Sequence, residues 1–265
     1  MIDWRHWHNE PYLIGGLIFL GWLYTILTGP LRNRFAPSSP YPRGKAFAFY
    51  GSIVLFYLAV GSPFDQIGER FLLTAHMLQH QILVYPCAIL MLSGIPSWLV
   101  RPITGQTSLQ SLFRFLTRPI VCLTIYTLTY SIWHAPDLYD WALQNKVVHV
   151  WEHIMFFGAA LIFWWPVFSP SPDFPPAAFA TQMIYQLFAV IGMTPVYAFI
   201  TFSSNVLYPT YEYAPRILPN FSPEDDQLMG GVTMELVGIF VSLCAFAWSF
   251  YRWYNKTERR SSPST

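Results

Sequence analysis

Seven long apolar segments, each close to the length that crosses a lipid bilayer, constrain this chain more than any other feature. A transmembrane helix needs about 20 residues, and the fourth segment is short by that measure. Polar stretches rich in Pro and Gly separate the segments. The pattern predicts an all-α, polytopic transmembrane bundle of seven helices. The segments are Pro11–Gly29, Gly44–Ser62, Phe71–Leu92, Ile120–His134, Val147–Phe168, Ala177–Phe202 and Leu228–Tyr254.

The overall composition agrees with a membrane protein. Hydrophobic residues make up 54% of the chain and charged residues only 11%, whereas about 25% of a soluble domain is charged. The formal net charge of +1 gives no strongly basic face, which excludes nucleic acid as a partner. We expect residues 1–254 to form one transmembrane domain and residues 255–265 to form a polar, disordered cytoplasmic tail.

The distribution of basic residues predicts the orientation. With seven spans and the N-terminus outside, eleven of the 15 Lys and Arg residues fall in the inner loops and tail, and four fall outside. Basic residues accumulate on the cytoplasmic side of membrane proteins, so the C-terminus is expected to be cytoplasmic. The same arrangement places all 7 histidines in the outer half of the protein. Polar groups at membrane depth usually mark function, so we expect a metal-binding vestibule there.

Two of the apolar segments carry histidine pairs with helical spacing. His76 and His80 are four residues apart in the third segment, and His149 and His153 are four apart in the fifth. Residues i and i+4 lie on one face of a helix, so two facing helices would bring four imidazoles together. The chain has no CxxC motif, which leaves imidazole, thioether and carboxylate as ligands. This set suits copper, with thioether favouring Cu(I), and zinc is the alternative.

The predicted metal site contains four principal ligands and four further candidates. Glu152 is either a ligand or the acceptor that fixes an imidazole tautomer. The competing interpretation is that the histidines only form hydrogen bonds between helices. The principal ligands are His76, His80, His149 and His153, and the further candidates are Met77, His134, Glu152 and Met234.

Asp225, Asp226 and Gln227 stand immediately before the seventh apolar segment. Carboxylates in the first turn of a helix stabilise it through the helix dipole. If they point toward the predicted vestibule instead, they would attract an incoming cation. The sequence leaves both roles open.

Several motifs, taken in order, resemble the CtaG-like family of assembly factors for caa-type cytochrome c oxidases. This family is the multi-span type, distinct from the single-span copper chaperone that shares its short name. The resemblance extends from about Ala46 to Tyr251. The motifs are HMLQH, SGIP, WHAPDLYDWAL, VHVWEH, FWWPV and DQLMGGVTME. The residues that match the histidine motifs are His76, His80, His134, His149, Glu152 and His153, and those that match the last motif are Asp226, Gln227, Gly231 and Met234.

The resemblance implies a multi-pass protein of the bacterial plasma (inner) membrane that is needed to produce active oxidase. Our leading hypothesis is a non-enzymatic assembly factor that binds copper in the outer half of the bundle and supports metal insertion into the oxidase. Its expected partners are the lipid bilayer, cytochrome c oxidase subunits and a periplasmic or extracellular copper chaperone.

Three other interpretations remain open on the sequence alone. One is a seven-span zinc-dependent hydrolase of lipid amides or esters, with Glu152 or Asp226 as the base. Another is a haem protein with axial histidines, although Trp151, Gln79 and Met77 are expected to crowd the ring. The last is a structural role in which the histidines join helices.

Overall fold

The computed structural model describes residues 3–5, 7–36 and 39–261, and the regular elements in this part of the chain are all helices. The prediction of an all-α fold is confirmed. In chain order the elements are α1 (Pro11–Thr28), α2 (Arg32–Phe35), α3 (Arg43–Gly61), α4 (Pro63–Arg70), α5 (Leu73–Ile82), η1 (Leu83–Cys87), α6 (Ala88–Gly94), α7 (Ser97–Thr104), η2 (Thr107–Leu109), α8 (Gln110–Leu116), α9 (Pro119–Trp133), α10 (Pro136–Gln144), α11 (Lys146–Phe168), α12 (Phe179–Phe202), α13 (Pro209–Glu212) and α14 (Pro223–Ser261).

Six helices of the described chain are long and apolar enough to cross a membrane, when α5, η1 and α6 are taken as one. The exception among the predicted spans is α9, which has 15 residues. It qualifies only together with the preceding residues Thr107–Leu116, from which it is bent by 68°. The count is therefore six, or seven if this bent pair is one span. The boundaries of the first six predicted segments agree with the observed helices to within two residues.

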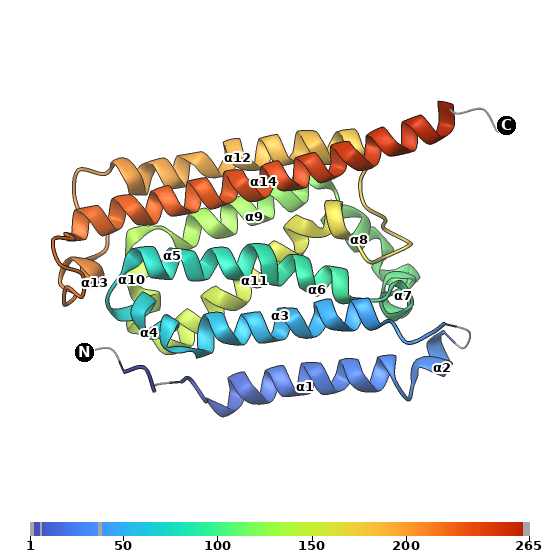
Figure 1. The fold of residues 1–265 in the computed structure, drawn as a ribbon, viewed down its shortest axis with the longest axis horizontal. Helices are drawn as coiled ribbons and strands as arrows, with labels where there is room; N and C mark the ends of the chain where they lie inside the picture. Colours follow the sequence, from blue (N-terminus) through green and yellow to red (C-terminus); the bar gives the residue numbers. More distant parts are fainter. Residues whose placement is uncertain (1–2, 6, 37–38, 262–265) are drawn as a thin grey trace.

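The long helices lie side by side along one axis (Figure 1). Helix α12 packs along α14, and α14 packs on α5, while α11 packs against α9 and α6. Helix α1 lies at the edge of the bundle beside α3. The largest buried cluster contains side chains of α5, α9, α11, α12 and α14. Helices α5 and α11, which carry the four principal predicted ligands, are therefore in the interior.

Short helices cover the two ends of the bundle. Helices α4, α10 and α13 lie at the end where α5 and α14 begin, and α2, α7 and α8 lie at the opposite end (Figure 1). The two ends of the chain also lie at opposite ends of the bundle (Figure 1). Because His76 and His149 are each in the first turn or two of their helices, the histidine motifs lie toward the end that carries α4.

The third predicted span contains Pro86, and a proline inside a helix favours a kink. The structure accommodates this proline in the π-helical segment η1 between α5 and α6. Proline has no N–H to donate and crowds the preceding turn, and a π-helical turn relieves both problems by adding a residue. The indole N–H of Trp164 donates to the carbonyl oxygen of Val84 in this segment at 2.9 Å. The span therefore continues past His80 without a break.

Helix α14 is longer than the sequence analysis predicts. It starts five residues before Leu228 and continues to Ser261, so the prediction of disorder is wrong for residues 255–261. At 1.5 Å per residue, a helix of 39 residues is roughly 58 Å long and projects past a bilayer core of about 30 Å. The polar residues Lys256, Glu258 and Arg259 have good helix propensity, which explains why the helix continues outside the apolar segment.

Candidate metal centre

The two predicted histidine pairs face each other inside the bundle. The ring centroids of His76 and His80 on α5 are 4.3 Å apart, and those of His149 and His153 on α11 are also 4.3 Å apart. Between the helices, His76 lies 5.4 Å from His149, and His80 lies 5.4 Å from His153. All four residues are buried, with at most 7% of their surface exposed. The helical spacing thus brings four imidazoles together.

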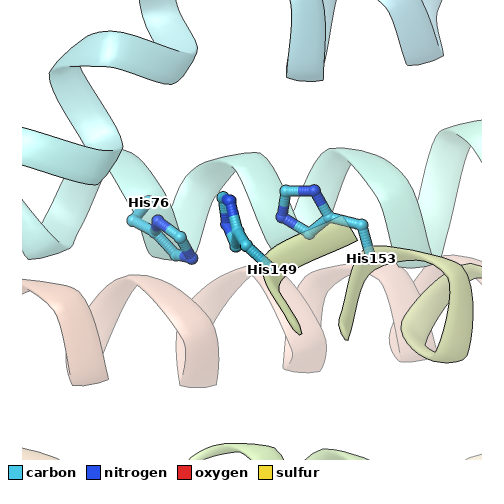
Figure 2. Close-up of side chains that lie close together, drawn as sticks. All are labelled: His76, His149 and His153. Carbon is cyan, nitrogen blue, oxygen red and sulfur yellow. The ribbon is translucent and has the colours of Figure 1, made fainter. Parts of the chain in front are cut away.

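Three of these rings form one possible set of metal ligands. Figure 2 shows His76, His149 and His153 in a row between the helices. One ring nitrogen of each lies within 4.8 Å of those of the other two. Imidazole is a ligand for both copper and zinc. The group therefore offers three nitrogen ligands from two helices.

Glu152 adds a carboxylate to the same cluster. Ligand atoms of His76, His80 and Glu152 also lie within 4.8 Å of one another, so His76 belongs to both groups. The Glu152 oxygens are 4.0 Å from Nε2 of His80 and 3.9 Å from Nε2 of His149, which is too long for hydrogen bonds. Glu152 is only 1% exposed. A buried carboxylate therefore lies among imidazoles without bonding directly to these two rings.

Most polar atoms of the cluster have no hydrogen-bond partner in the described part of the chain. Buried polar groups are normally bonded, because an unpaired one costs about 1–3 kcal/mol. Seven such atoms lie on α5 and α11, and the eighth, of His134, lies at the end of α9. Histidines that only joined helices would have these atoms paired, whereas free lone pairs are what a metal ion requires. The atoms are both ring nitrogens of His76 and of His80, the Nε2 atoms of His134, His149 and His153, and Oε1 of Glu152.

Two of the rings are held so that Nε2 is free to bind an ion. Nδ1 of His134 lies 2.8 Å from the carbonyl oxygen of Tyr130, and Nδ1 of His149 lies 2.8 Å from Oε1 of Glu69. A histidine that donates from Nδ1 carries its lone pair on Nε2, and metal-binding histidines are usually fixed in this way. The His134 ring is 5.8 Å from that of His80. The structure therefore places His134 beside the cluster, as the sequence analysis expects.

Glu69 is a residue of the site that the sequence analysis missed. It lies on α4, a separate short helix, so no periodicity along α5 or α11 connects it to His149. Helix α4 approaches α5 closely at Gly68, where a Cβ atom would lie 3.0 Å from Cα of His76. Burial opposes ionisation of Glu69, but its hydrogen bond with His149 and the positive charges nearby together lower the pKa of the carboxyl. Glu69 is therefore a charged acceptor for this imidazole.

Asp226 caps the helix that carries the first histidine pair. Its carboxylate accepts hydrogen bonds from the backbone N–H groups of Leu73 and Thr74, at 2.7 and 2.9 Å, and from the Thr74 hydroxyl at 2.8 Å. These amides open α5 and have no partner within their own helix. Asp226 lies in the first turn of α14, so its charge stabilises the start of a neighbouring helix. Both of its oxygens are occupied in this way.

The rest of the DQLMGG motif joins α14 to its neighbours. The Gln227 side chain accepts from the N–H of Leu207 at 2.6 Å and donates to the carbonyl of Asn205 at 3.0 Å. At Gly231 a Cβ atom would lie 3.0 Å from the backbone nitrogen of Thr201 on α12. The motif therefore positions α14 against α5 and α12.

The two methionine candidates have other neighbours. Sδ of Met234 accepts a hydrogen bond from the Tyr130 hydroxyl at 3.5 Å. Met77 is fully buried and packs where α14 passes α5 at Gly230. Thioether ligation by either residue stays a prediction of the sequence.

Three buried tyrosines cover the cluster at the end of the bundle. They are Tyr139 on α10, Tyr211 on α13 and Tyr208 just before α13, each at most 1% exposed. The Tyr139 ring lies 5.4 Å from that of His76, and the hydroxyls of Tyr139 and Tyr211 are 3.2 Å apart. The Tyr208 hydroxyl donates to the carbonyl of His134 at 3.0 Å. These contacts close the direct route to the histidines from that end.

A side cavity of about 320 Å³ reaches the cluster instead. His149 and His153 form part of its wall, together with apolar side chains of α1, α3 and α11 such as Leu17, Phe56 and Phe157. Two histidines of the cluster therefore border a cavity between these helices.

The sequence analysis expects Trp151 to crowd a haem, and this argument is wrong for that residue. Trp151 is 58% exposed and points away from the cluster, because it lies between the two histidines of α11 on the opposite face. The covering tyrosines and Phe156, whose ring is 4.7 Å from that of His80, occupy the space beside the histidines instead. Little room is left there for a porphyrin.

The fold and the cluster define a multi-pass helical membrane protein with a buried histidine and carboxylate centre. Comparison with protein families then gives a more specific result. Residues 22–256 match the family described as cytochrome c oxidase caa3 assembly factor (Caa3_CtaG). The match covers most of the chain, which belongs to this family, and the resemblance found from the sequence is confirmed. Comparisons with curated proteins and with solved structures give no match.

Proposed function

We propose that this protein binds copper at the histidine cluster and supports its insertion into a caa3-type cytochrome c oxidase. In this proposal the metal is cargo and the protein acts without catalysing a reaction. Membership of the family of caa3 oxidase assembly factors supports a role in the assembly of this oxidase. The principal ligands are those predicted from the sequence, His76, His80, His149 and His153.

The observation that carries the proposal is the convergence of unpaired ligand atoms. Seven ring nitrogens and one carboxylate oxygen are buried in one cluster without hydrogen-bond partners among the described residues. A purely structural set of histidines would join helices through hydrogen bonds, and an imidazole can both donate and accept them. Unpaired nitrogens contribute nothing to such a role. Metal binding supplies the missing interaction.

The geometry also supports exchange of the ion. The cluster has more ligand atoms than one ion needs, and His76 is shared between two possible ligand groups. An ion can therefore change ligands stepwise without being released into the membrane. The side cavity at His149 and His153 provides a route to the site.

We infer that the cluster faces the outside of a bacterial plasma membrane. The excess of Lys and Arg at the opposite end supports a cytoplasmic C-terminus. An oxidase subunit would then receive copper on the outer side, and a periplasmic or extracellular chaperone would be its source. Cu(I) remains the ion favoured by the sequence, whereas an imidazole and carboxylate set also accepts Cu(II) and Zn(II).

The test is the copper content of the oxidase in bacteria that lack this chain and receive a variant of it. We expect His76→Ala/His153→Ala to leave the oxidase poor in copper and inactive, although the variant itself is still found in the membrane. Trp151→Ala is the matched control, because this side chain lies on α11 between two ligands but faces outward. Full oxidase activity with the histidine variant would refute the proposal.

The side cavity gives the zinc hydrolase a specific observation in its favour. Apolar side chains and two of the histidines line the same space, as a lipid substrate would require. Asp226 does not fit the role of base, because its oxygens bind Leu73 and Thr74, which leaves Glu152. Zinc-loaded protein incubated with lipid amides and esters tests this alternative, and the absence of hydrolysis would reject it.

A further inference from the structure

A second group of possible metal ligands lies next to the histidine cluster. Ligand atoms of His8, Asp65 and Glu69 all lie within 4.8 Å of one another. Asp65 and Glu69 are one helical turn apart on α4, and His8 comes from the segment before α1. His8 also precedes the residues matched by the family, which start at 22.

One carboxylate of this group is buried and the other is partly exposed. Asp65 is 3% exposed, and the Glu69 side chain is 24% exposed. Their close ion-pair partners in the described chain are imidazoles: Nε2 of His8 lies 3.1 Å from Asp65, and Nδ1 of His149 lies 2.8 Å from Glu69. A buried carboxylate with a second, partly buried carboxylate beside it favours positive charge nearby. Hard oxygen ligands with one imidazole suit a divalent cation better than Cu(I).

The side cavity connects this group with the histidine cluster. All three residues of the second group line this cavity, and so do His149 and His153. Nε2 of His153 is buried and has no hydrogen-bond partner in the described chain. Because the tyrosines cover the end of the bundle, this cavity is the space that the carboxylates and His153 share.

We propose that His8, Asp65 and Glu69 form an outer loading site for a divalent metal cation. From this site His149, which contacts Glu69 on one side and the cluster on the other, passes the ion inward. The transfer step rests on the proposed function, whereas the outer site itself does not. The ion exchanges ligands one at a time, and no change of oxidation state is involved.

The same residues also hold the N-terminal segment in place, since the His8 N–H donates to the carbonyl of Gly61 at 2.9 Å and the His8 ring lies 3.0 Å from Glu10. A purely structural network would affect stability but not the number of bound ions. A test must therefore count ions and measure their rate of binding in variants that stay folded.

The experiment uses the full-length protein in detergent and Zn(II) as a redox-inactive probe. The outer variant is His8→Gln/Asp65→Asn, in which the amides are close in size to the groups they replace. Asp65→Asn alone retains the oxygen that accepts from Gln79, and it serves as the milder variant if the pair unfolds. The inner variant is His76→Ala/His153→Ala. The control is Glu224→Gln, which removes an exposed carboxylate at the start of α14.

We expect the wild type and the control to bind about one more zinc ion per chain than either the outer or the inner variant. We also expect the inner site of the outer variant to load at least about tenfold more slowly at low zinc, because carboxylates lining the cavity raise the local cation concentration. Equal zinc content and equal loading in the outer variant and the wild type would overturn the outer site and leave the proposed function intact. Complete loss of zinc in the inner variant would also overturn the outer site, because that site should still hold an ion. Loss of zinc in the outer variant but not in the inner variant would support the outer site and contradict the proposed function.

Discussion

The two faces of α5 use buried polar residues in opposite ways. Toward α14, Asp226 accepts hydrogen bonds from the first amides of α5, and the Met234 sulfur accepts one from the Tyr130 hydroxyl. Gln227 on the same helix accepts from the backbone of Leu207, in the segment between α12 and α13. Toward α11, the rings of His76 and His80 are just as deeply buried but have no hydrogen-bond partners in the described chain. The motifs on both sides look equally rich in polar residues when only the sequence is considered.

Whether a buried polar group has a hydrogen-bond partner distinguishes structural residues from residues that bind a ligand. A satisfied buried polar group adds to stability, whereas an unsatisfied one reduces it. The α14 face is therefore structural, and the α11 face costs stability that a bound ion would restore. This distinction leads to predictions of opposite sign for substitutions only a few ångströms apart.

The largest effect is expected for Asp226→Ala on the structural face. The substitution leaves the buried amides of Leu73 and Thr74 without an acceptor and removes a charge from the start of α5. We expect the protein to lose about 3 kcal/mol or more of stability. Thermal unfolding in detergent measures this loss, with Asp225→Ala, one position earlier and exposed, as the control. A stability equal to that of the wild type would contradict the role of Asp226 as a cap.

Glu152→Gln tests the other face and should change metal preference. A carboxylate is a good ligand for Zn(II) and a poor one for Cu(I). We expect zinc affinity to fall about 10- to 100-fold, while Cu(I) affinity stays within a few-fold of the wild type. Competition titrations with a chelator for each ion give both values. An equal loss for the two ions would show that Glu152 acts through protein structure rather than as a ligand.

A smaller loss is expected for Tyr130→Phe. The Tyr130 hydroxyl accepts from Gln81 at 2.8 Å and donates to Met234, so the change removes two hydrogen bonds but keeps the ring that stacks on His134. We expect a loss of about 1–2 kcal/mol. Thermal unfolding would detect it, and metal content should remain that of the wild type. Loss of the metal together with stability would place Tyr130 in the binding site.

The smallest effect on stability is expected for His76→Leu in the metal-free protein. This change removes two unpaired buried nitrogens and replaces them with an apolar side chain of similar size. The free energy of unfolding should stay within about 1 kcal/mol of the wild type or rise. Unfolding measured in the presence of a chelator gives the result. A large loss would mean that His76 forms structural hydrogen bonds, and the contrast between the two faces would disappear.

The sequence predicts the histidine cluster well because its information is local. Spacing of four residues on a helix determines which side chains share a face, and the apolar segments fix the helices that carry them. His76 and His153 can therefore be placed near each other before the structure is known. The ends of the apolar segments are equally local, and six of them agree with the helices found.

Contacts between helices could not be predicted in the same way. Glu69 and Asp226 are separated from their partners by many residues and by helix boundaries, and no periodicity relates them. The length of α14 was missed because hydropathy marks only the part of a helix that lies within the membrane. The helix itself continues into polar sequence at both ends. The short helix α9 was harder to interpret for another reason. Its apolar sequence gives its length but not the bend that separates it from α8.

The central claim is most directly tested by the copper content of the purified protein. Wild type and His76→Ala/His153→Ala are offered Cu(I) under reducing conditions, freed of excess metal and analysed by mass spectrometry, with Trp151→Ala as the control. The account predicts copper on the wild type and the control, and its loss from the histidine variant while the variant remains folded. Equal copper on all three proteins would contradict it.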